Sequence, residues 1–154
     1  MSSERRKYAP IGFIEPGVVT SDAVQIVPNA TLYHFGVITS NVHMAWMRTI
    51  CGRLKSDYRY SKEVVYNTFP WPTPNEQQRA KIEKTAQAIL DARNLYSEYT
   101  FADLYNKDDE WMYPELFKAH QENDKAVMEA YGFNPRMTES ECVAALFALY
   151  QKLT

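Results

Sequence analysis

The sequence predicts an α+β protein that is mainly helical, with a small α/β portion followed by a C-terminal helical bundle. The first observation is a row of prolines at alternate positions, Pro70, Pro72 and Pro74. Each proline fixes its own φ and restricts the preceding residue to extended conformations, so this stretch is an extended connector. The second observation is that residues 1–72 mix β-branched runs with a helical pattern, whereas residues 73–154 carry only helical patterns. These two ranges are the predicted domains.

The composition is that of an ordinary globular protein. Of the 154 residues, 45% are hydrophobic and 14% aromatic, which is too many for a disordered chain. No run approaches the ~20 apolar residues of a membrane span, and no apolar stretch follows the basic residues near the start, as a secretory signal would require. Two cysteines cannot form a disulfide framework or a zinc cage. We therefore expect a cytoplasmic protein without a membrane partner.

Before the connector, the pattern predicts two short strands and one helix. The β-branched segment 10–28 is interrupted by a Pro-Gly pair, which is typical of two strands joined by a turn. Over residues 30–51, apolar residues recur every three or four positions, which indicates one helix with a buried face. Gly52 is well placed to end this helix. Residues 53–66 then alternate polar and apolar residues, as expected of a loop that leads into a strand.

After the connector, capping signals mark a long helix and a short one. Asn75 and Gln78 form a reciprocal capping box that opens a helix ending near Tyr96. Thr100 can cap a short helical turn that ends near Tyr105. The apolar stripe of the long helix consists of Ile82, Ala86, Ile89 and Leu90.

Two further amphipathic helices follow. Pro114 lies in the first turn of a helix that runs to Tyr131 and ends at Gly132, the usual placement of proline and glycine at helix ends. Thr138 and Glu141 form a second capping box, which opens the last helix. The apolar stripe of that helix consists of Val143, Leu146, Phe147, Tyr150 and Leu153. Helices that each carry one apolar face are expected to pack together as a bundle.

Within the connector, Phe69 and Trp71 are separated by one proline, so both rings can face the same side of an extended chain. We expect both rings to be largely buried, against the helix of residues 30–51 or against the bundle. The connector would then act as a packed brace between the two halves of the chain.

Charge is distributed unevenly between the halves. Residues 1–72 carry eight Lys or Arg and five Asp or Glu, a net charge of +3. Residues 73–154 carry nine basic and fourteen acidic residues, a net charge of −5. This asymmetry is a weak indication of a polyanion or an acidic partner on one side of the molecule. Ordinary variation on a solvated surface explains it equally well.

Signs of an active site are few. The five glycines are far apart and form no phosphate-binding loop. His34 and His43 are nine residues apart on one predicted helix, so they face opposite sides and cannot share a metal ion. His120 is interpreted as part of a solvated helix face, and Cys51 and Cys142 as small buried hydrophobic residues. The sequence therefore predicts no catalytic residue, no cofactor-binding residue and no metal ligand.

Residues 53–62 have the pattern of a DNA-reading edge. From position 53 to position 59 every second residue is charged, so in one extended segment these side chains would point to the same side. Lys and Arg donate hydrogen bonds to guanine, and Asp accepts one from the amino group of cytosine. The basic cluster Arg-Arg-Lys at residues 5–7 could add phosphate contacts. The alternative is a surface strand whose charges are merely solvated. The predicted DNA-binding residues are Arg53, Lys55, Asp57, Arg59, Ser61 and Lys62.

The run from His34 to Pro72 carries a long and specific pattern. It reads F-G-V-x-[ST]-S, then W-x-R, then G-R-L-K-S-x-x-R-Y-S, then Y-N-T-F-P-x-P. This pattern resembles the target-recognition segment of MmeI-like type IIG restriction–modification enzymes, which are adenine-specific DNA methyltransferases. The later stretch from His120 to Gly132 is similar to the terminal helices of such enzymes.

The resemblance implies that residues 1–72 are the C-terminal part of a DNA target-recognition domain and that residues 73–154 are a C-terminal helical bundle. It also implies a region that is non-catalytic by itself, because the S-adenosylmethionine loop and the N-P-P-[YFW] motif of such methyltransferases are absent from the sequence. S-adenosylmethionine is then expected in the parent enzyme and no cofactor in this region. The expected partners are double-stranded DNA and the rest of the parent chain.

The resemblance also assigns roles within the predicted reading edge. Base-contacting side chains of the family fall in the segment that matches residues 55–59. Lys55 and Asp57 would then jointly read one base pair, and Arg59 a neighbouring one. A G·C pair suits the first two, with Lys55 on guanine and Asp57 on the cytosine amino group.

Two other functions fit the same sequence. The acidic C-terminal half and the aromatic connector also suit a helical protein-interaction or assembly module of a phage-defence methyltransferase. An independent small enzyme is the third alternative. The salt dependence of DNA binding separates the first two, because each phosphate contact releases condensed counterions.

Overall fold

The computed structural model describes residues 2–3, 7–14, 17, 26–50, 52–54, 57–59 and 65–153. Within these residues the chain is mainly helical, which confirms the predicted fold class at that level. The helices are α1 (Leu32–Ile38), α2 (Asn41–Ile50), α3 (Glu76–Asn94), α4 (Phe101–Leu104), α5 (Pro114–Tyr131) and α6 (Glu139–Leu153), with a 3-10 helix, η2, over Lys107–Met112. The short strands β1 (Ser2–Ser3), β2 (Gly52–Leu54) and β3 (Asp57–Arg59) form a small antiparallel sheet.

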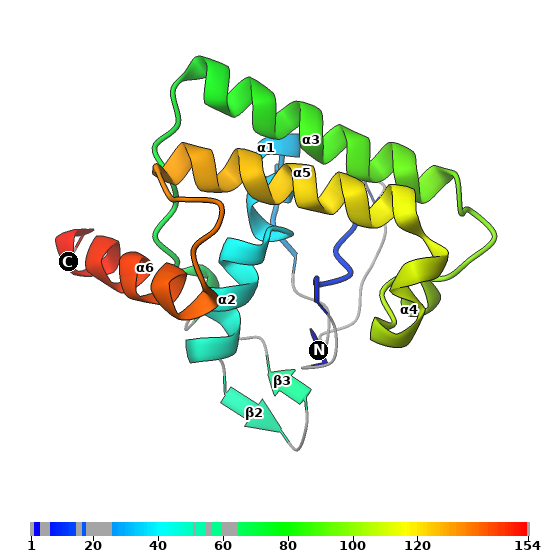
Figure 1. The fold of residues 1–154 in the computed structure, drawn as a ribbon, viewed down its shortest axis with the longest axis horizontal. Helices are drawn as coiled ribbons and strands as arrows, with labels where there is room; N and C mark the ends of the chain where they lie inside the picture. The colour runs from blue at the N-terminus through cyan, green and yellow to red at the C-terminus, as the bar shows by residue number, and fades with distance from the viewer. Residues whose placement is uncertain are drawn as a thin grey trace.

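The two longest helices, α3 and α5, lie antiparallel and side by side across one side of the molecule (Figure 1). α1 packs against them, and α2 continues from α1 toward the opposite side. α6 packs mainly on α2, and the strands β2 and β3 project from the end of α2, away from α3. Among the described residues, no helix is both long enough and apolar enough to cross a membrane.

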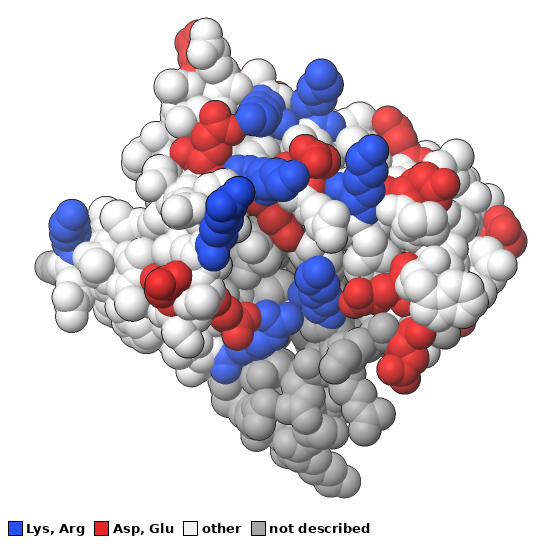
Figure 2. Space-filling model, in the orientation of Figure 1, with Lys and Arg blue, Asp and Glu red and all other residues white. Residues whose placement is uncertain are grey.

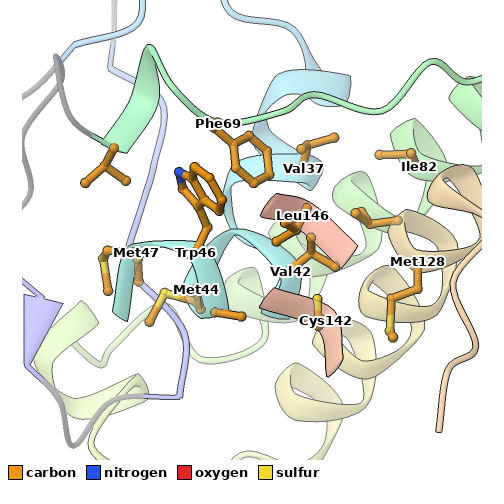
Figure 3. Packing of buried hydrophobic residues seen from close by; sticks show 14 of the residues in the cluster. Val37, Val42, Met44, Trp46, Met47, Phe69, Ile82, Met128, Cys142 and Leu146 are labelled. Atoms are coloured by element: carbon orange, nitrogen blue, oxygen red, sulfur yellow. The ribbon is translucent and has the colours of Figure 1, made fainter. Parts of the chain in front are cut away.

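The hydrophobic core consists of two clusters that both draw on residues before and after the connector. The first surrounds α2 and joins it to α3, α5 and α6, as Figure 3 shows from close by. The second joins Tyr8 and Phe35 to α3, α4 and α5. α1 and α2 are therefore enclosed by helices that follow the connector, and the two halves of the chain share one core.

The sequence predicted one continuous helix over residues 30–51, but the structure has two helices there, so this prediction is wrong. The chain breaks at Thr39 and Ser40, which are both fully buried. The Ser40 hydroxyl donates to the carbonyl of Val37 at 2.7 Å and accepts from the backbone N–H of His43 at 3.4 Å. Serine side chains compete in this way with helical hydrogen bonds. The apolar spacing runs through the break and cannot reveal it.

The capping predictions after the connector are confirmed. Asn75 and Gln78 exchange side chain–backbone hydrogen bonds of 2.8 and 3.1 Å at the start of α3. Thr138 and Glu141 do the same at the start of α6. Gly132 ends α5 with a φ of 75°, in the left-handed region that favours glycine. These signals act within a few residues of each helix end, so the sequence alone is sufficient to place them.

The three C-terminal helices do not pack together in the way that the sequence predicted. α3 and α5 pack on each other as expected, and Thr100 caps the short helix α4 between them. α6 instead packs mainly on α2, where Phe147 and Tyr150 contact Trp46. Leu153, the last residue of the predicted stripe, is 72% exposed. An amphipathic pattern shows that a helix has an apolar face, but it does not specify which neighbour covers that face.

The two strands expected over residues 10–28 are not found where the structure describes this segment. Residues 10–14 and 26–28 are irregular, and the remaining positions apart from Gly17 lie outside the described residues. The carbonyl of Ile11 accepts a hydrogen bond from Arg93 at 2.6 Å, so a side chain occupies the acceptor that a neighbouring strand would use. In the described residues, strand structure is limited to the small sheet.

The connector packs as expected at Phe69 and less completely at Trp71. Phe69 is 4% exposed, and its ring lies edge-on to His43 with 4.5 Å between centroids. Trp71 is only partly buried, and it contacts Tyr33 and Phe69. The burial prediction is therefore confirmed for Phe69 and confirmed only in part for Trp71.

Candidate nucleic-acid interface

Of the residues predicted to read DNA, Arg53, Asp57 and Arg59 lie in the strands of the small sheet beyond the end of α2. β2 and β3 are antiparallel, with Leu54 paired to Asp57 and Arg53 paired to Tyr58. The chain therefore reverses direction between Leu54 and Asp57. β1 lies along the other edge of β3, with Ser3 paired to Asp57, so β3 is the central strand. Below, the term hairpin means β2 and β3 with their connection.

This register overturns the expected single row of charges. The prediction placed positions 53 to 59 on one extended segment, where alternate residues share a side. In an antiparallel ladder, paired positions share a face and successive positions alternate, so position 53 shares the face of position 58. Positions 57 and 59 belong to the other face. The reversal after Leu54 shifts the alternation by one position, so position 53 does not share a face of the ladder with positions 57 and 59.

The other predicted contacts are placed only in part. The positions that lie outside the described residues are Arg5, Arg6, Lys55, Ser61 and Lys62. Lys7 is described, and its exposed side chain lies 5.7 Å from the centroid of the Tyr8 ring. Their predicted contacts with DNA stay predictions.

α2 gives the hairpin a rigid base. Val42, Met44 and Met47 are fully buried, and Trp46 is 1% exposed. Figure 3 shows these side chains together with Phe69 in one closely packed group. Because protein interiors are packed as densely as organic crystals, a helix buried to this extent is itself held in a defined place.

Arg48, in the last turn of α2, links the base of the hairpin to two other elements. Its guanidinium forms an ion pair with Glu139 of α6 and donates to the backbone carbonyl of Lys7 at 3.2 Å. The Glu139 side chain is 53% exposed, so the ion pair contributes little stability by itself. The contact with the carbonyl nevertheless fixes where the N-terminal segment passes α2.

A buried tyrosine anchors the N-terminal segment to α5. Tyr8 is 1% exposed, and its hydroxyl donates to a carboxylate oxygen of Asp124 at 2.5 Å. Its ring stacks on the imidazole of His120 with 4.2 Å between centroids. Desolvation, followed by the negative charge of Asp124, raises the pKa of Tyr8 above its usual value. The hydroxyl therefore remains a donor at every ordinary pH.

His120 belongs to the same buried network, so its interpretation as part of a solvated face is wrong. It is fully buried, and its Nε2 lies 2.7 Å from the Tyr105 hydroxyl. Arg93 donates to that hydroxyl oxygen from Nε and Nη2, at 2.9 and 2.6 Å, which leaves the hydroxyl proton for His120. Desolvation, aided by the charges of Arg93 and Lys7, lowers the pKa of His120 to about 3. The imidazole is therefore neutral.

Sequence reasoning missed this network, although one signal for it was available. The buried positions of α5 include Leu116, His120, Asn123, Asp124 and Val127, which follow a helical spacing. Polar residues on a buried stripe indicate hydrogen-bond partners inside the protein. No sequence signal identifies those partners, since Tyr8 and Asp124 are 116 residues apart.

Histidine and cysteine side chains serve packing and capping in the described part of the chain. Among the described residues there is no group of three or more His, Cys, Asp or Glu that could hold a metal ion. His34 contacts Thr31 at the start of α1, whereas His43 is buried in the core. Cys142 is 5% exposed, as predicted for a small buried residue, and Cys51 lies outside the described residues.

The face formed by α3 and α5 carries both signs of charge. Figure 2 shows Lys and Arg interspersed with Asp and Glu over these helices. Lys81 pairs with Glu129 between the two helices at 2.5 Å, and Arg79 pairs with Glu83 within α3. A surface of mixed and paired charges attracts a phosphate backbone poorly.

Comparison with known proteins divides the chain at the connector. Residues 1–73 match the family described as MmeI, target recognition domain, and residues 74–154 match MmeI, C-terminal domain. The chain belongs to the MmeI family. This membership confirms the resemblance carried by the pattern from His34 to Pro72.

Two proteins that this chain is similar to are much longer than the chain. DNA methyltransferase A of Bacillus subtilis (strain 168) is 36% identical over 154 residues, which are 100% of this chain and 17% of that protein. A structure of the type IIL restriction-modification enzyme MmeI in complex with DNA shares 49% identity and a TM-score of 0.92, over 99% of this chain and 20% of that one. The chain therefore spans a fifth or less of the length of these relatives.

Proposed function

We propose that this chain is the DNA sequence-recognition region of a larger DNA methyltransferase and is non-catalytic by itself. The observation that carries this function is the similarity of 99% of the chain, at 49% identity, to part of an MmeI structure solved with DNA. The match to a DNA methyltransferase over the whole chain supports it. The partners would be double-stranded DNA and the rest of the parent chain. The parent would be an adenine-specific, cytoplasmic enzyme of restriction–modification or phage defence.

The two halves of the chain would have different roles in recognition. Residues 1–72 would be the C-terminal part of a target-recognition domain with α/β character, and residues 73–154 a C-terminal helical bundle that braces it. The shared core supports this division, because α3, α5 and α6 enclose α2, which carries the hairpin. A recognition site on a rigid element can hold its contacts within the narrow tolerances that specificity requires.

The hairpin would supply the base contacts. Lys55 and Asp57 would read one G·C pair and Arg59 a neighbouring base pair, since Lys and Arg donate to guanine and Asp accepts from cytosine. Positions 57 and 59 share a face of the ladder, which supports contacts of Asp57 and Arg59 with neighbouring base pairs. Phosphate contacts would come from a second group, which consists of Ser61, Lys62, the basic cluster at residues 5–7, and Arg53 on the opposite face of the ladder.

S-adenosylmethionine would bind the parent enzyme outside residues 1–154 and supply the transferred methyl group there. The sequence contains neither a glycine-rich loop nor an N-P-P-[YFW] motif. A hollow lined by Asn41, Met128 and Cys142, among others, holds only about 90 Å³, well below the ~300–1,000 Å³ of ordinary ligand pockets. These residues do not fit the cofactor, so we assign no catalytic step to them.

The test changes the proposed reading pair in the parent enzyme. Lys55→Gln together with Asp57→Asn removes the groups suited to G·C and offers amides, which pair well with adenine. Sequencing of the methylated DNA should show a change at one position of the recognised sequence. Lys84→Gln with Asp91→Asn makes the same charge changes at exposed positions of α3 and should leave the recognised sequence intact. An unchanged sequence in the hairpin variant would contradict the assignment.

A second candidate, a protein-interaction or assembly module, is favoured by an exposed apolar surface around α4. Trp111 is 77% exposed, Leu95 is 65% exposed and Phe101 is 42% exposed. Figure 2 shows acidic side chains gathered at this end of the molecule.

Duplex binding that falls steeply with rising salt supports DNA recognition. Duplex binding that is insensitive to salt, or absent at millimolar protein, supports the assembly module.

A further inference from the structure

We propose that Asp124 of α5 is a positioning residue for the hairpin, because its carboxylate holds both of the segments that lead to the outer strands of the sheet. The importance of this role for DNA rests on the function proposed above. Its structural part can be tested without DNA.

The geometry places one carboxylate between two distant segments. Asp124 is 8% exposed. One of its oxygens accepts from the Tyr8 hydroxyl at 2.5 Å, and the other accepts from the backbone N–H of Asn41 at 2.9 Å. Tyr8 follows β1 along the chain, and Asn41 is the first residue of α2, which is followed by β2. Since the strand order is β1-β3-β2, the chain segments that adjoin the two outer strands contact the same side chain.

A carboxylate suits this position chemically. The N–H groups in the first turn of a helix have no partner within the helix, and the helix dipole favours a negative charge there. The Tyr8 hydroxyl is a neutral donor that can satisfy the other oxygen, so both oxygens of the buried carboxylate have partners. A buried ionic group of this kind is weak evidence for stability alone, because a packed apolar group is often equally stable. What it provides here is a fixed geometry between α5, α2 and the N-terminal segment.

The neighbouring residue on α5 supplies a matched comparison. The Asn123 amide donates to the carbonyl of Gly36 in α1 at 2.8 Å, and its oxygen lies 2.8 Å from the Thr85 hydroxyl of α3. The bond to Gly36 is buried and the bond with Thr85 is partly buried, but both join α5 to α1 and α3 and do not involve the segments that flank the sheet. Tyr8→Phe and Thr85→Val therefore each remove one hydroxyl from a contact of α5, which is buried at Tyr8 and partly buried at Thr85, and only the first removes a contact of Asp124.

The structural test measures the orientation of the hairpin in the 154-residue chain. Residual dipolar couplings of the amides in β2 and β3, relative to those in α3 and α5, should change in Tyr8→Phe and in Asp124→Asn. The couplings within α3 and α5 should stay as they are in all variants. Thr85→Val should leave the couplings of the hairpin unchanged. If Asp124→Asn fails to fold, Tyr8→Phe decides. Unchanged hairpin couplings in Tyr8→Phe, or equal changes in Thr85→Val, would overturn the assignment.

The functional test uses the parent enzyme and compares methylation at its own sequence with methylation at sequences that differ by one base pair. Tyr8→Phe should lower this ratio at least several-fold, whereas Thr85→Val should keep it. A loss of overall rate with an unchanged ratio in Tyr8→Phe would indicate a merely structural role and would contradict the inference. If the wild-type enzyme showed no sequence preference, the proposed function would fail, while the couplings would still decide the role of Asp124.

Discussion

The α3–α5 pair and the hairpin region are specified in different ways. α3 begins at a capping box formed by Asn75 and Gln78, which are three residues apart, and α5 ends at Gly132. The segments that carry the hairpin are instead held by Asp124, which is 83 residues from Asn41 and 116 residues from Tyr8. The ends of these helices are specified by near neighbours in the sequence, whereas the segments that flank the small sheet are held by contacts that exist only in the folded chain.

The largest effect should come from removing a large side chain of the core cluster that surrounds α2. Trp46 is 1% exposed and contacts Phe69 of the connector and Tyr150 of α6. Trp46→Ala should lower the free energy of unfolding by ~3–5 kcal/mol, a large part of the ~5–15 kcal/mol of a typical domain. Urea denaturation followed by circular dichroism measures this change.

Trp111→Ala is the matched control, because Trp111 is 77% exposed. It should alter the free energy of unfolding by less than ~0.5 kcal/mol. Since both halves of the chain share one core, Trp46→Ala should shift one cooperative transition. Two separate transitions would show instead that the α3–α5 pair folds independently of α2.

The next effect is on acid stability and depends on buried histidines. The pKa of His120 is lowered to about 3 by burial, whereas an unperturbed histidine has a pKa of ~6.5. Between these values the unfolded chain binds a proton that the folded chain does not, so the free energy of unfolding falls as the pH falls. His43, with its pKa lowered to about 3 by burial, acts in the same direction. Asp124 acts oppositely, because burial raises its pKa from 3.8 to about 6.

His120→Gln should reduce the acid sensitivity. The amide oxygen of glutamine can accept from the Tyr105 hydroxyl in place of Nε2, and it does not titrate. Between pH 6 and 5, the free energy of unfolding should fall less steeply in the variant, by up to ~1.4 kcal/mol per pH unit. Urea denaturation at each pH gives the slope. Equal slopes in the two proteins would mean that His120 binds its proton in the folded chain, contrary to its burial beside Arg93.

A smaller and purely local effect is expected at the start of α3. Asn75→Ala removes the side chain that accepts from the backbone N–H of Gln78, and the loss of such a cap costs ~1 kcal/mol. Amide hydrogen exchange should quicken in the first turn of α3 and stay unchanged in the hairpin. Lys84→Ala, at an exposed position in the middle of the same helix, should leave both regions as they are. Equal loss of protection in the hairpin would show that the two regions are not specified separately.

The same contrast explains which features the sequence could predict. Gly132 and Thr138 mark helix ends through contacts with near neighbours, and both predictions are confirmed. The burial of Phe69 was predicted from its place directly before Pro70 in the extended connector, and this prediction is confirmed. The break at Ser40, the packing of α6 on α2 and the pairing of Arg53 with Tyr58 depend on partners or turns that no periodicity specifies. The base contacts proposed for Lys55 and Asp57 rest on the pattern of the family and stay a prediction.

The smallest effect should be the sequence preference of this chain alone. Its N-terminal half carries a net charge of only +3, from eight basic and five acidic residues. Its C-terminal half, with nine basic and fourteen acidic residues, repels phosphates within a Debye length of ~10 Å at 0.1 M salt. We expect a Kd no tighter than the ~10⁻⁴–10⁻⁶ M of non-specific binding. One or two bidentate contacts supply only ~1–3 kcal/mol each, so a preferred duplex would be barely distinguished. Fluorescence anisotropy with labelled duplexes at several salt concentrations tests this expectation. Nanomolar, sequence-specific binding would contradict this expectation. It would mean that these 154 residues are sufficient to hold the hairpin in its DNA-binding position, without the rest of the parent chain.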